Sequence, residues 1–153
     1  MISIDIPGLA TIELHHAVFD INGTLAVDGV LIPGAKDRLG MLASHLSIHL
    51  LTAGTHGNLE ELTQRLSYPL QIIKSGEDKA RYVQELGPAN VIAFGNGAND
   101  VGMLRAAAIG VAVMIAEGVA TSALQVADVL APGPLEAIDL VLKPKRLIAT
   151  LRP

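Results

Sequence analysis

The chain contains no cysteine and no tryptophan, and its 153 residues include only two phenylalanines and two tyrosines. Without cysteine, disulfide bonds, thiolate metal sites and cysteine nucleophiles are excluded. In the most apolar region the longest stretch without a charged residue covers 106–116, far short of the ~20 residues that cross a bilayer. The N-terminus shows no basic segment followed by an apolar block, so no secretory signal is visible. We therefore expect a cytoplasmic protein that does not enter a membrane.

The chain also lacks the positive charge that a nucleic-acid-binding surface needs. Its net charge is -4, so nucleic acid is not an expected partner. One local exception is a basic cluster near the end of the chain, formed by Lys143, Lys145, Arg146 and Arg152. Basic residues at the C-terminus of a final helix usually complement its dipole. A partner-binding tail is the alternative.

Half of the residues are apolar, and few of these are aromatic. Short aliphatic runs suit strands that are buried on both faces of a parallel sheet. Hydrophobic periodicity and turn signals predict strands at 2–6, 10–14, 16–20, 48–51, 70–73, 91–94, 110–115 and 129–130. The same criteria predict helices at 34–45, 57–67, 77–86, 100–107, 118–126, 134–142 and 144–151. Strands that alternate with helices indicate βαβ units.

The predicted fold is a single α/β domain over residues 1–153, doubly wound and three-layered like a Rossmann fold. We expect a central parallel sheet of about five or six strands. Residues 1–15 should form an N-terminal β-hairpin, 16–142 the core, and 143–153 a C-terminal helix or tail. A small β-flap is expected at 25–33, around an Asp28-Gly29 turn.

Polar residues stand where several predicted strands end. Asp20 follows a buried strand, Thr52 ends the next, and a glycine-rich loop at 95–100 follows the strong strand at 91–94. Lys79 lies in the helix before that loop. The carboxyl ends of parallel strands share one edge of a sheet, where ligands bind. A carboxylate nucleophile, a hydroxyl, an ammonium and the further carboxylate of Asp100 suit phosphoryl transfer with Mg²⁺.

Four motifs in this order resemble the haloacid dehalogenase-like superfamily. They are Asp20-Ile-Asn-Gly-Thr-Leu25, the apolar strand ending in Thr52, Lys79, and Gly95-Asn-Gly-Ala-Asn-Asp100. Within the superfamily, the chain is most similar to the phosphorylation domain of P-type ATPases and to soluble P-type ATPase-like proteins. The likeness covers residues 17–141. It implies a haloacid dehalogenase-like fold without a cap domain, because the intervals 25–48 and 54–79 are too short to hold one.

The resemblance implies a role for each matching residue. The catalytic residues would be Asp20 as the nucleophile that becomes an aspartyl-phosphate, Asn22 and Lys79. The phosphoryl group would be bound by Thr24, Thr52, Ala53, Gly54 and Lys79. The Mg²⁺ ligands would come from Asp20, Asn22, Asn96 and Asp100. The substrate would be a phosphorylated small molecule or macromolecule, and a capless member can also form a homo-oligomer that covers the site.

Two of these positions depart from the family pattern. Phosphatases have an aspartate general acid–base where this chain has Asn22, and a metal-binding aspartate where it has Asn96. An amide cannot exchange protons, and general acid–base help is typically about 10²–10⁴-fold. We therefore expect a slow phosphohydrolase or phosphotransferase with weak Mg²⁺ binding. The alternative is a catalytically weakened regulatory module that binds phosphate and metal.

Each candidate also has a simpler interpretation. Asp20 is a possible turn residue, Thr52 a strand cap and Asp100 a helix cap, while Lys74 is an alternative to Lys79. The five histidines show no metal-binding spacing, and His56 is the one placed near a strand end, where a substrate could be contacted. Met103 and Met114 are expected to fill the core.

Overall fold

The computed structural model describes residues 1–54 and 59–153. Its centre is a six-stranded sheet in which every pair of neighbouring strands is parallel. The strands are β3 (His16–Asp20), β6 (Ser47–Thr52), β7 (Leu70–Ile72), β8 (Val91–Gly95), β9 (Ile109–Val113) and β10 (Val129–Ala131). Their order is β10-β9-β8-β3-β6-β7. The chain thus winds outward from β3 in both directions, which confirms the predicted doubly wound sheet.

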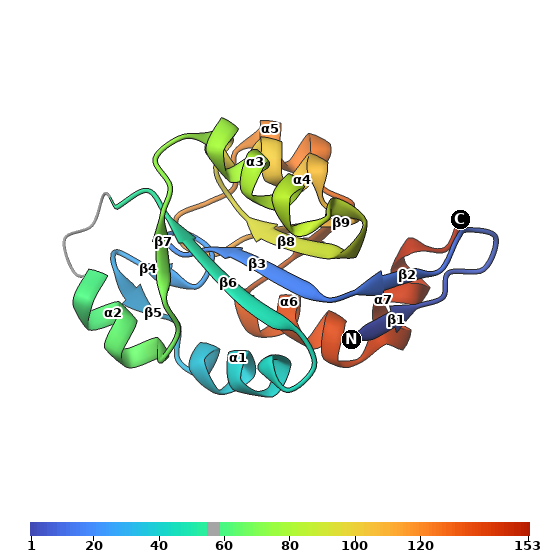
Figure 1. Ribbon diagram of the computed structural model, residues 1–153, viewed down its shortest axis with the longest axis horizontal. Coiled ribbons are helices and arrows are strands. Elements are labelled where there is room, and N and C mark those ends of the chain that lie inside the picture. The colour runs from blue at the N-terminus through green and yellow to red at the C-terminus, as the bar shows by residue number, and fades with distance from the viewer. Residues whose placement is uncertain (55–58) are drawn as a thin grey trace.

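Helices cover both faces of the sheet (Figure 1). On one face lie α1 (Ala35–Ala43) and α6 (Pro134–Leu142), and on the other α3 (Gly76–Leu86), α4 (Val101–Ala106) and α5 (Thr121–Val126). Helix α2 (Leu59–Leu66) lies near the edge strand β7, and α7 (Pro144–Leu151) packs against α6 and the N-terminal hairpin. Two short 3-10 turns, η1 (Pro88–Asn90) and η2 (Ala98–Asp100), flank β8. The three predicted layers are therefore present.

Strict alternation along the central strands divides the core into two halves. In β3, Ala17 and Phe19 face the larger cluster under α1 and α6, whereas Val18 joins the smaller cluster with Val83 of α3. Successive side chains of a strand point to opposite faces, so a strand buried on both sides must be apolar throughout. Phe19 stacks on Phe94 of the neighbouring β8, with ring centroids 4.3 Å apart. This central pair stabilises the two strands whose ends carry the candidate site.

Two antiparallel hairpins stand outside the main sheet. Strands β1 (Ile2–Ile4) and β2 (Ile12–Leu14) form the predicted N-terminal hairpin. The predicted flap is β4 (Ala26–Val27) and β5 (Val30–Leu31). Both residues of its turn have positive φ, 51° at Asp28 and 77° at Gly29. That conformation matches a tight hairpin turn that favours Asp-Gly.

Some details differ from the sequence prediction. Helix α5 begins at Thr121 rather than near residue 118, and the helix expected from residue 100 is preceded by the 3-10 turn η2. Met103 is buried as expected, but Met114 is 48% exposed because it stands just past the end of β9. His56 and the expected start of the helix at 57–58 lie outside the described residues.

The expectation for the C-terminal basic cluster holds only in part. Lys145 and Arg146 lie in the first turn of α7, whose last turn contains no basic residue, and Arg152 is the C-cap of that helix. Lys143 instead ends α6, where its ammonium pairs with Asp139 at 3.1 Å, and Arg146 lies 3.9 Å from the same carboxylate. These side chains connect α6 to α7. Within the described residues, no helix has the length and apolar character of a membrane span.

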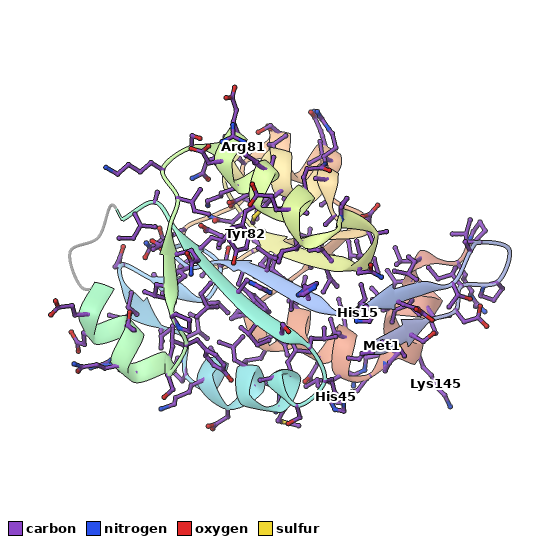
Figure 2. All side chains as sticks on the ribbon, in the orientation of Figure 1. Met1, His15, His45, Arg81, Tyr82 and Lys145 are labelled. Carbon is purple, nitrogen blue, oxygen red and sulfur yellow. The ribbon has the colours of Figure 1, made fainter. Side chains whose placement is uncertain are left out.

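A chain of polar side chains crosses the face of the sheet under α3. His16 Nδ1 lies 3.1 Å from His49 Nε2, and His49 Nδ1 lies 2.9 Å from the Tyr82 hydroxyl. Figure 2 shows Tyr82 on the sheet side of α3, with Arg81 on its outer side. Burial, together with the neighbouring His15, lowers the pKa of His16. Burial, together with His16, lowers the pKa of His49.

We expect the contribution of His16 and His49 to the free energy of unfolding to fall as the pH drops through about 6.5, the ordinary pKa of histidine. Below that pH the unfolded chain takes up protons that the folded pair, with its lowered pKa values, still refuses. Urea unfolding at several pH values measures the effect, and His49→Gln should flatten the profile. The exposed His45 supplies a control in His45→Gln, which should keep the wild-type profile. Equal profiles for wild type and His49→Gln would contradict the expectation.

Candidate active site

A buried lysine lies between two carboxylates at the carboxyl edge of the sheet. Lys79 Nζ donates to Asp20 Oδ1 and to Asp100 Oδ1, each at 2.7 Å. Lys79 and Asp100 are fully buried, and Asp20 is 7% exposed. Asp20 ends β3, while Asp100 follows β8, the adjacent strand. Three residues that the sequence places far apart therefore meet at one point.

Local sequence explains how Lys79 and Asp100 reach these positions. Ser75 caps α3 by accepting from the Asp78 amide at 3.0 Å, so Lys79 lies in the helix's first turns. Asp100 Oδ2 accepts from the amides of Asn96 and Gly97, at 3.0 and 2.9 Å. The loop folds back so closely that a Cβ on Gly95 would lie 2.7 Å from the Asp100 carboxylate. Both Asp100 oxygens are thus engaged within the protein.

The charges of this group do not balance. Two carboxylates share one ammonium in a buried setting. Burial raises the pKa of the Asp20 carboxyl to about 7, with help from the Asp100 charge, while Lys79 opposes the rise. Burial alone would lower the pKa of Lys79, but Asp20 and Asp100 together raise it above its ordinary value. A surplus of negative charge beside Asp20 favours a cation there.

Asn22 and Asn96, the two residues that depart from the family pattern, line the same pocket as Asp20. Thr24 Oγ1 is 3.4 Å from Asp20 Oδ2 and 3.4 Å from Asn96 Oδ1. Asn96 Nδ2 donates to the Gly118 carbonyl at 3.1 Å, which turns its amide oxygen toward Thr24. Asn22 Oδ1 is buried, and among the described residues it has no hydrogen-bond partner. Gly23 has φ +82°, and a Cβ there would lie 2.2 Å from Asn96 Nδ2, so only glycine fits this contact.

The predicted phosphate-binding residues lie at the end of β6. Thr52 is buried, and its Oγ1 accepts from the Gly54 amide at 3.2 Å. Ala53 lines the same pocket as Asp20. Thr24 is fully buried and contacts Asp20 instead of opening into the pocket. Lys74, the alternative to Lys79, is exposed in the segment before α3.

These elements enclose a pocket of about 220 Å³, whose lining residues are Asp20, Asn22, Ala53, Asn96, Gly97, Asn99 and Glu117. Three of these, Gly97, Asn99 and Glu117, were not among the site residues predicted from the sequence. Asn99 belongs to the glycine-rich loop that carries Asn96. Glu117 follows β9 by four residues. The available signal was an acidic residue just past the carboxyl end of a strand, where a parallel sheet presents its ligand-binding groups.

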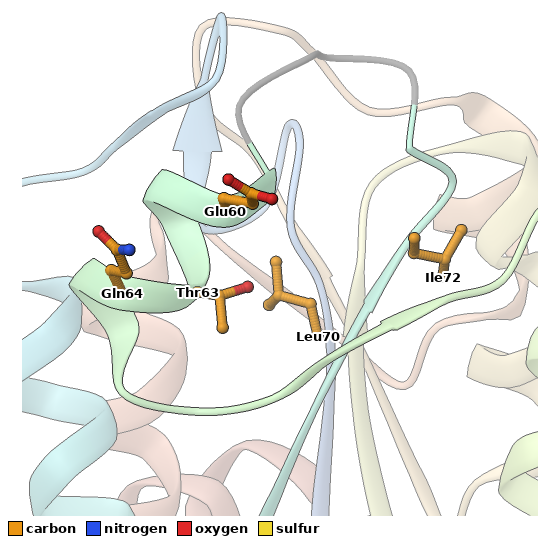
Figure 3. A pocket seen from close by; sticks show the side chains of 5 residues that line it. All are labelled: Glu60, Thr63, Gln64, Leu70 and Ile72. Carbon is orange, nitrogen blue, oxygen red and sulfur yellow. The ribbon is translucent and has the colours of Figure 1, made fainter.

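A second pocket lies between α2 and the edge strand β7, and Figure 3 shows the side chains that line it. They are Glu60, Thr63, Gln64, Leu70 and Ile72. Among the described residues of this lining, Glu60 is the only one that is ionisable. The pocket at Asp20 has two acids in its lining, Asp20 and Glu117. The predicted site residues Asp20, Asn22, Ala53 and Asn96 line that pocket and do not line this one.

The residues around Asp20 fit a hard divalent cation, although they include few charges. In the described part of the chain, no three histidine or acidic residues cluster as a metal site. Asp20, Asn22 and Asn96 nevertheless line one pocket, and Asn22 Oδ1 has no hydrogen-bond partner among the described residues. Mg²⁺ prefers oxygen ligands and usually keeps several waters. One carboxylate and two amide oxygens match that preference.

Comparisons with known proteins agree with the fold. The chain resembles a solved hydrolase of the haloacid dehalogenase superfamily, subfamily III A, from Legionella pneumophila, with a TM-score of 0.69 and 17% identity over 89% of this chain and 87% of that chain. The chain also resembles a 3-deoxy-D-manno-octulosonate 8-phosphate phosphatase from Moraxella catarrhalis, in complex with magnesium, phosphate and KDO. The TM-score is 0.65, with 18% identity over 91% of this chain and 94% of that chain. For the cobalt-bound deoxy-D-mannose-octulosonate 8-phosphate phosphatase from Haemophilus influenzae, the TM-score is 0.68, with 14% identity over 86% of this chain and 88% of that chain. The search of curated proteins returned no match to the sequence.

A family model adds a direct sequence relation. The model for haloacid dehalogenase-like hydrolases matches residues 30–129, well over half of the chain. This range contains Thr52, Lys79, Asn96 and Asp100, and it begins after Asp20. The closer likeness to soluble P-type ATPase-like proteins stays a prediction. The chain belongs to the haloacid dehalogenase-like hydrolases.

Proposed function

We propose that this protein is a phosphohydrolase or phosphotransferase in which Asp20 attacks a phosphoryl group and carries it as an aspartyl-phosphate. The observation that carries the proposal is the buried Lys79 bridge, which holds Asp20 and Asp100 together at the edge of the sheet. Two structural neighbours are phosphatases, one in complex with magnesium and phosphate, and this supports the reaction type. The substrate would be a phosphorylated small molecule or macromolecule.

The chain's own residues have distinct parts in this reaction. Lys79 holds Asp20 Oδ1, which leaves Oδ2, beside the Thr24 hydroxyl, as the oxygen that attacks phosphorus. The new Oδ2–P bond forms as the bond to the leaving oxygen breaks, and that oxygen keeps the electron pair. The Ala53 amide at the pocket and the Thr52 hydroxyl, which itself accepts from the Gly54 amide, would donate to the phosphoryl oxygens. Asp100 positions Lys79 and the loop at Asn96 and Gly97.

Mg²⁺ is the proposed cofactor, and it would supply positive charge against the phosphoryl oxygens. Asp20, Asn22 and Asn96 would hold it. Asp100 was also a candidate ligand, but its two oxygens are engaged by Lys79 and by backbone amides, so the proposal gives it a supporting part instead. With one carboxylate among three protein ligands, binding should be weak.

Turnover would be slow because Asn22 replaces the proton-transferring acid. Its amide can neither protonate a leaving alkoxide nor activate water. Acyl phosphates, whose leaving groups need little protonation, should therefore be better donors than alkyl phosphates. The aspartyl-phosphate itself should also decay more slowly, since Asn22 cannot activate the water that hydrolyses it.

We expect acetyl phosphate with Mg²⁺ to add one phosphoryl group to the wild-type protein, detected by intact-mass spectrometry and removed by hydroxylamine. Asp20→Asn should abolish the added mass, because the amide is a poor nucleophile. Asp5→Asn, at an exposed position on the hairpin, should leave it unchanged. Omission of Mg²⁺ should reduce the labelling. Absence of labelling with acetyl phosphate, p-nitrophenyl phosphate and ATP would contradict the proposal and favour the binding-module alternative.

The proposed assembly follows from the open site. Residues 1–153 would act as one domain, and no cap is inserted in the described parts of the intervals around β4, β5 and α2. A large substrate or a second copy of the chain would then have to cover the pocket. Light scattering distinguishes a homo-oligomer from a monomer.

A further inference from the structure

The candidate site holds a second carboxylate that the reaction above does not use. Glu117 lines the same pocket of about 220 Å³ as Asp20 and Asn22. It is exposed, and it stands in the connection between β9 and α5. Asp100, by contrast, is fully buried, and both of its carboxylate oxygens accept hydrogen bonds within the protein.

The chemistry of the lining leaves few groups that can accept a proton. Asn22, Asn96 and Asn99 present amides, and Ala53 and Gly97 have no ionisable side chain. Asp20 is occupied by the phosphoryl group once the intermediate has formed. Among the described residues of the lining, Glu117 is then the one that still offers a free carboxylate. We propose that Glu117 is the general base for hydrolysis of phospho-Asp20, an inference that rests on the proposed function.

One hydrogen bond holds the Glu117 carboxylate, and two more hold the backbone that follows Glu117 beside the pocket. The Asp28 amide of the flap donates to Glu117 Oε2 at 3.2 Å. The backbone just after Glu117 is tied to the loop at 95–100, since Asn96 Nδ2 donates to the Gly118 carbonyl at 3.1 Å and the Ala120 amide donates to the Asn96 carbonyl at 2.8 Å. The flap contact uses one of the two carboxylate oxygens. A carboxylate with an oxygen to spare can orient a water toward phosphorus.

The step balances without any further reactant. The oxygen of a water forms a bond to phosphorus while Glu117 takes one of its protons. The bond between phosphorus and Asp20 Oδ2 breaks, and its electron pair returns to the carboxylate. Inorganic phosphate leaves, and the exposed Glu117 passes its proton to solvent. Glu117 thus supplies the proton acceptance that Asn22 lacks.

The test is the lifetime of the phosphoenzyme. Protein labelled with acetyl phosphate is freed of donor, and the decay of the labelled mass is followed in Mg²⁺ buffer. Glu117→Gln should lengthen the lifetime by about 10²-fold or more and leave the rate of labelling near the wild-type rate. Glutamine retains an oxygen that can accept from the Asp28 amide, so the flap contact is preserved. Glu13→Gln, an equivalent charge loss at an exposed hairpin position, should leave both rates unchanged.

A double variant separates proton transfer from a structural effect. Asn22→Asp restores an acid beside Asp20, so it should shorten the lifetime again in the Glu117→Gln protein. An unchanged lifetime in Glu117→Gln overturns the inference. Parallel slowing of labelling and decay, without recovery by Asn22→Asp, also overturns it and leaves Glu117 as a flap anchor. Failure of the wild-type protein to label at all points instead to the failure of the proposed function.

Discussion

Replacement of Lys79 by methionine should destabilise the protein by about 3–5 kcal/mol and abolish labelling by acetyl phosphate. The methionine side chain nearly matches the length of lysine but leaves Asp20 and Asp100 buried with no counter-ion. The fold must then protonate a carboxylate or admit water, and either change costs stability. Urea unfolding measures the loss, and mass spectrometry measures the labelling.

Lys74→Met is the matched control, because Lys74 is an exposed lysine five residues earlier. Its unfolding free energy should stay within about 0.5 kcal/mol of wild type. A second variant, Lys79→Arg, separates charge from shape. Arginine keeps the positive charge, so it should recover part of the stability while its larger planar head displaces Asp20 and still lowers labelling. A stable Lys79→Met protein that labels normally would show that the bridge has no part in the chemistry.

Asn22→Asp should raise the rate at which alkyl phosphates phosphorylate Asp20 by about 10²–10⁴-fold, because a positioned acid would then protonate the leaving alkoxide. The new carboxylate would occupy the position where Asn22 now holds a buried, unpartnered amide oxygen. It can protonate a leaving alkoxide in the first step and accept a proton from water in the second. Inorganic phosphate release from p-nitrophenyl phosphate and from an alkyl phosphate provides the measurement.

Asn99→Asp is the control for charge alone, since Asn99 lines the same pocket. It adds the same carboxylate at a position that is not two residues after the nucleophile, so no gain is expected. An equal gain in both variants would mean that pocket charge, rather than a positioned acid, limits the reaction. Asn96 is less suitable for this experiment. Its Nδ2 donates to the Gly118 carbonyl at 3.1 Å, and an aspartate there would bring two oxygens together.

The sequence predicted those parts of the fold that depend on local pattern. Strand β3 was predicted with its observed bounds, because three apolar residues precede an acid and a glycine-containing turn. The flap turn at Asp28-Gly29 was also predicted, since few dipeptides accept two positive φ angles. Asp20, Thr52 and the loop at 95–100 were expected at one edge of the sheet, which follows from parallel strands ending together.

What the sequence could not give depends on three-dimensional contacts. Nothing local indicates that Lys79 bridges two carboxylates, or that both oxygens of Asp100 are taken up within the protein. Glu117 enters the pocket because the connection after β9 is bonded to Asn96, and no periodic pattern records that contact. The basic cluster was only partly placed: Lys143 and Arg152 cap the ends of α6 and α7, but Lys145 and Arg146 lie at the beginning of α7.

The bridge at Lys79 also bears on how this chain can change by mutation. The ion pairs that orient Asp20 join α3 to the ends of β3 and β8, so the reactive centre is part of what keeps the fold intact. A descendant that had lost all turnover would still be selected to retain Asp20, Lys79 and Asp100. In a set of relatives, retention of those three side chains would therefore indicate that the fold is kept, whether or not the protein turns over a substrate. The residue types at positions 22, 96 and 117 would instead indicate which reaction each relative can still catalyse.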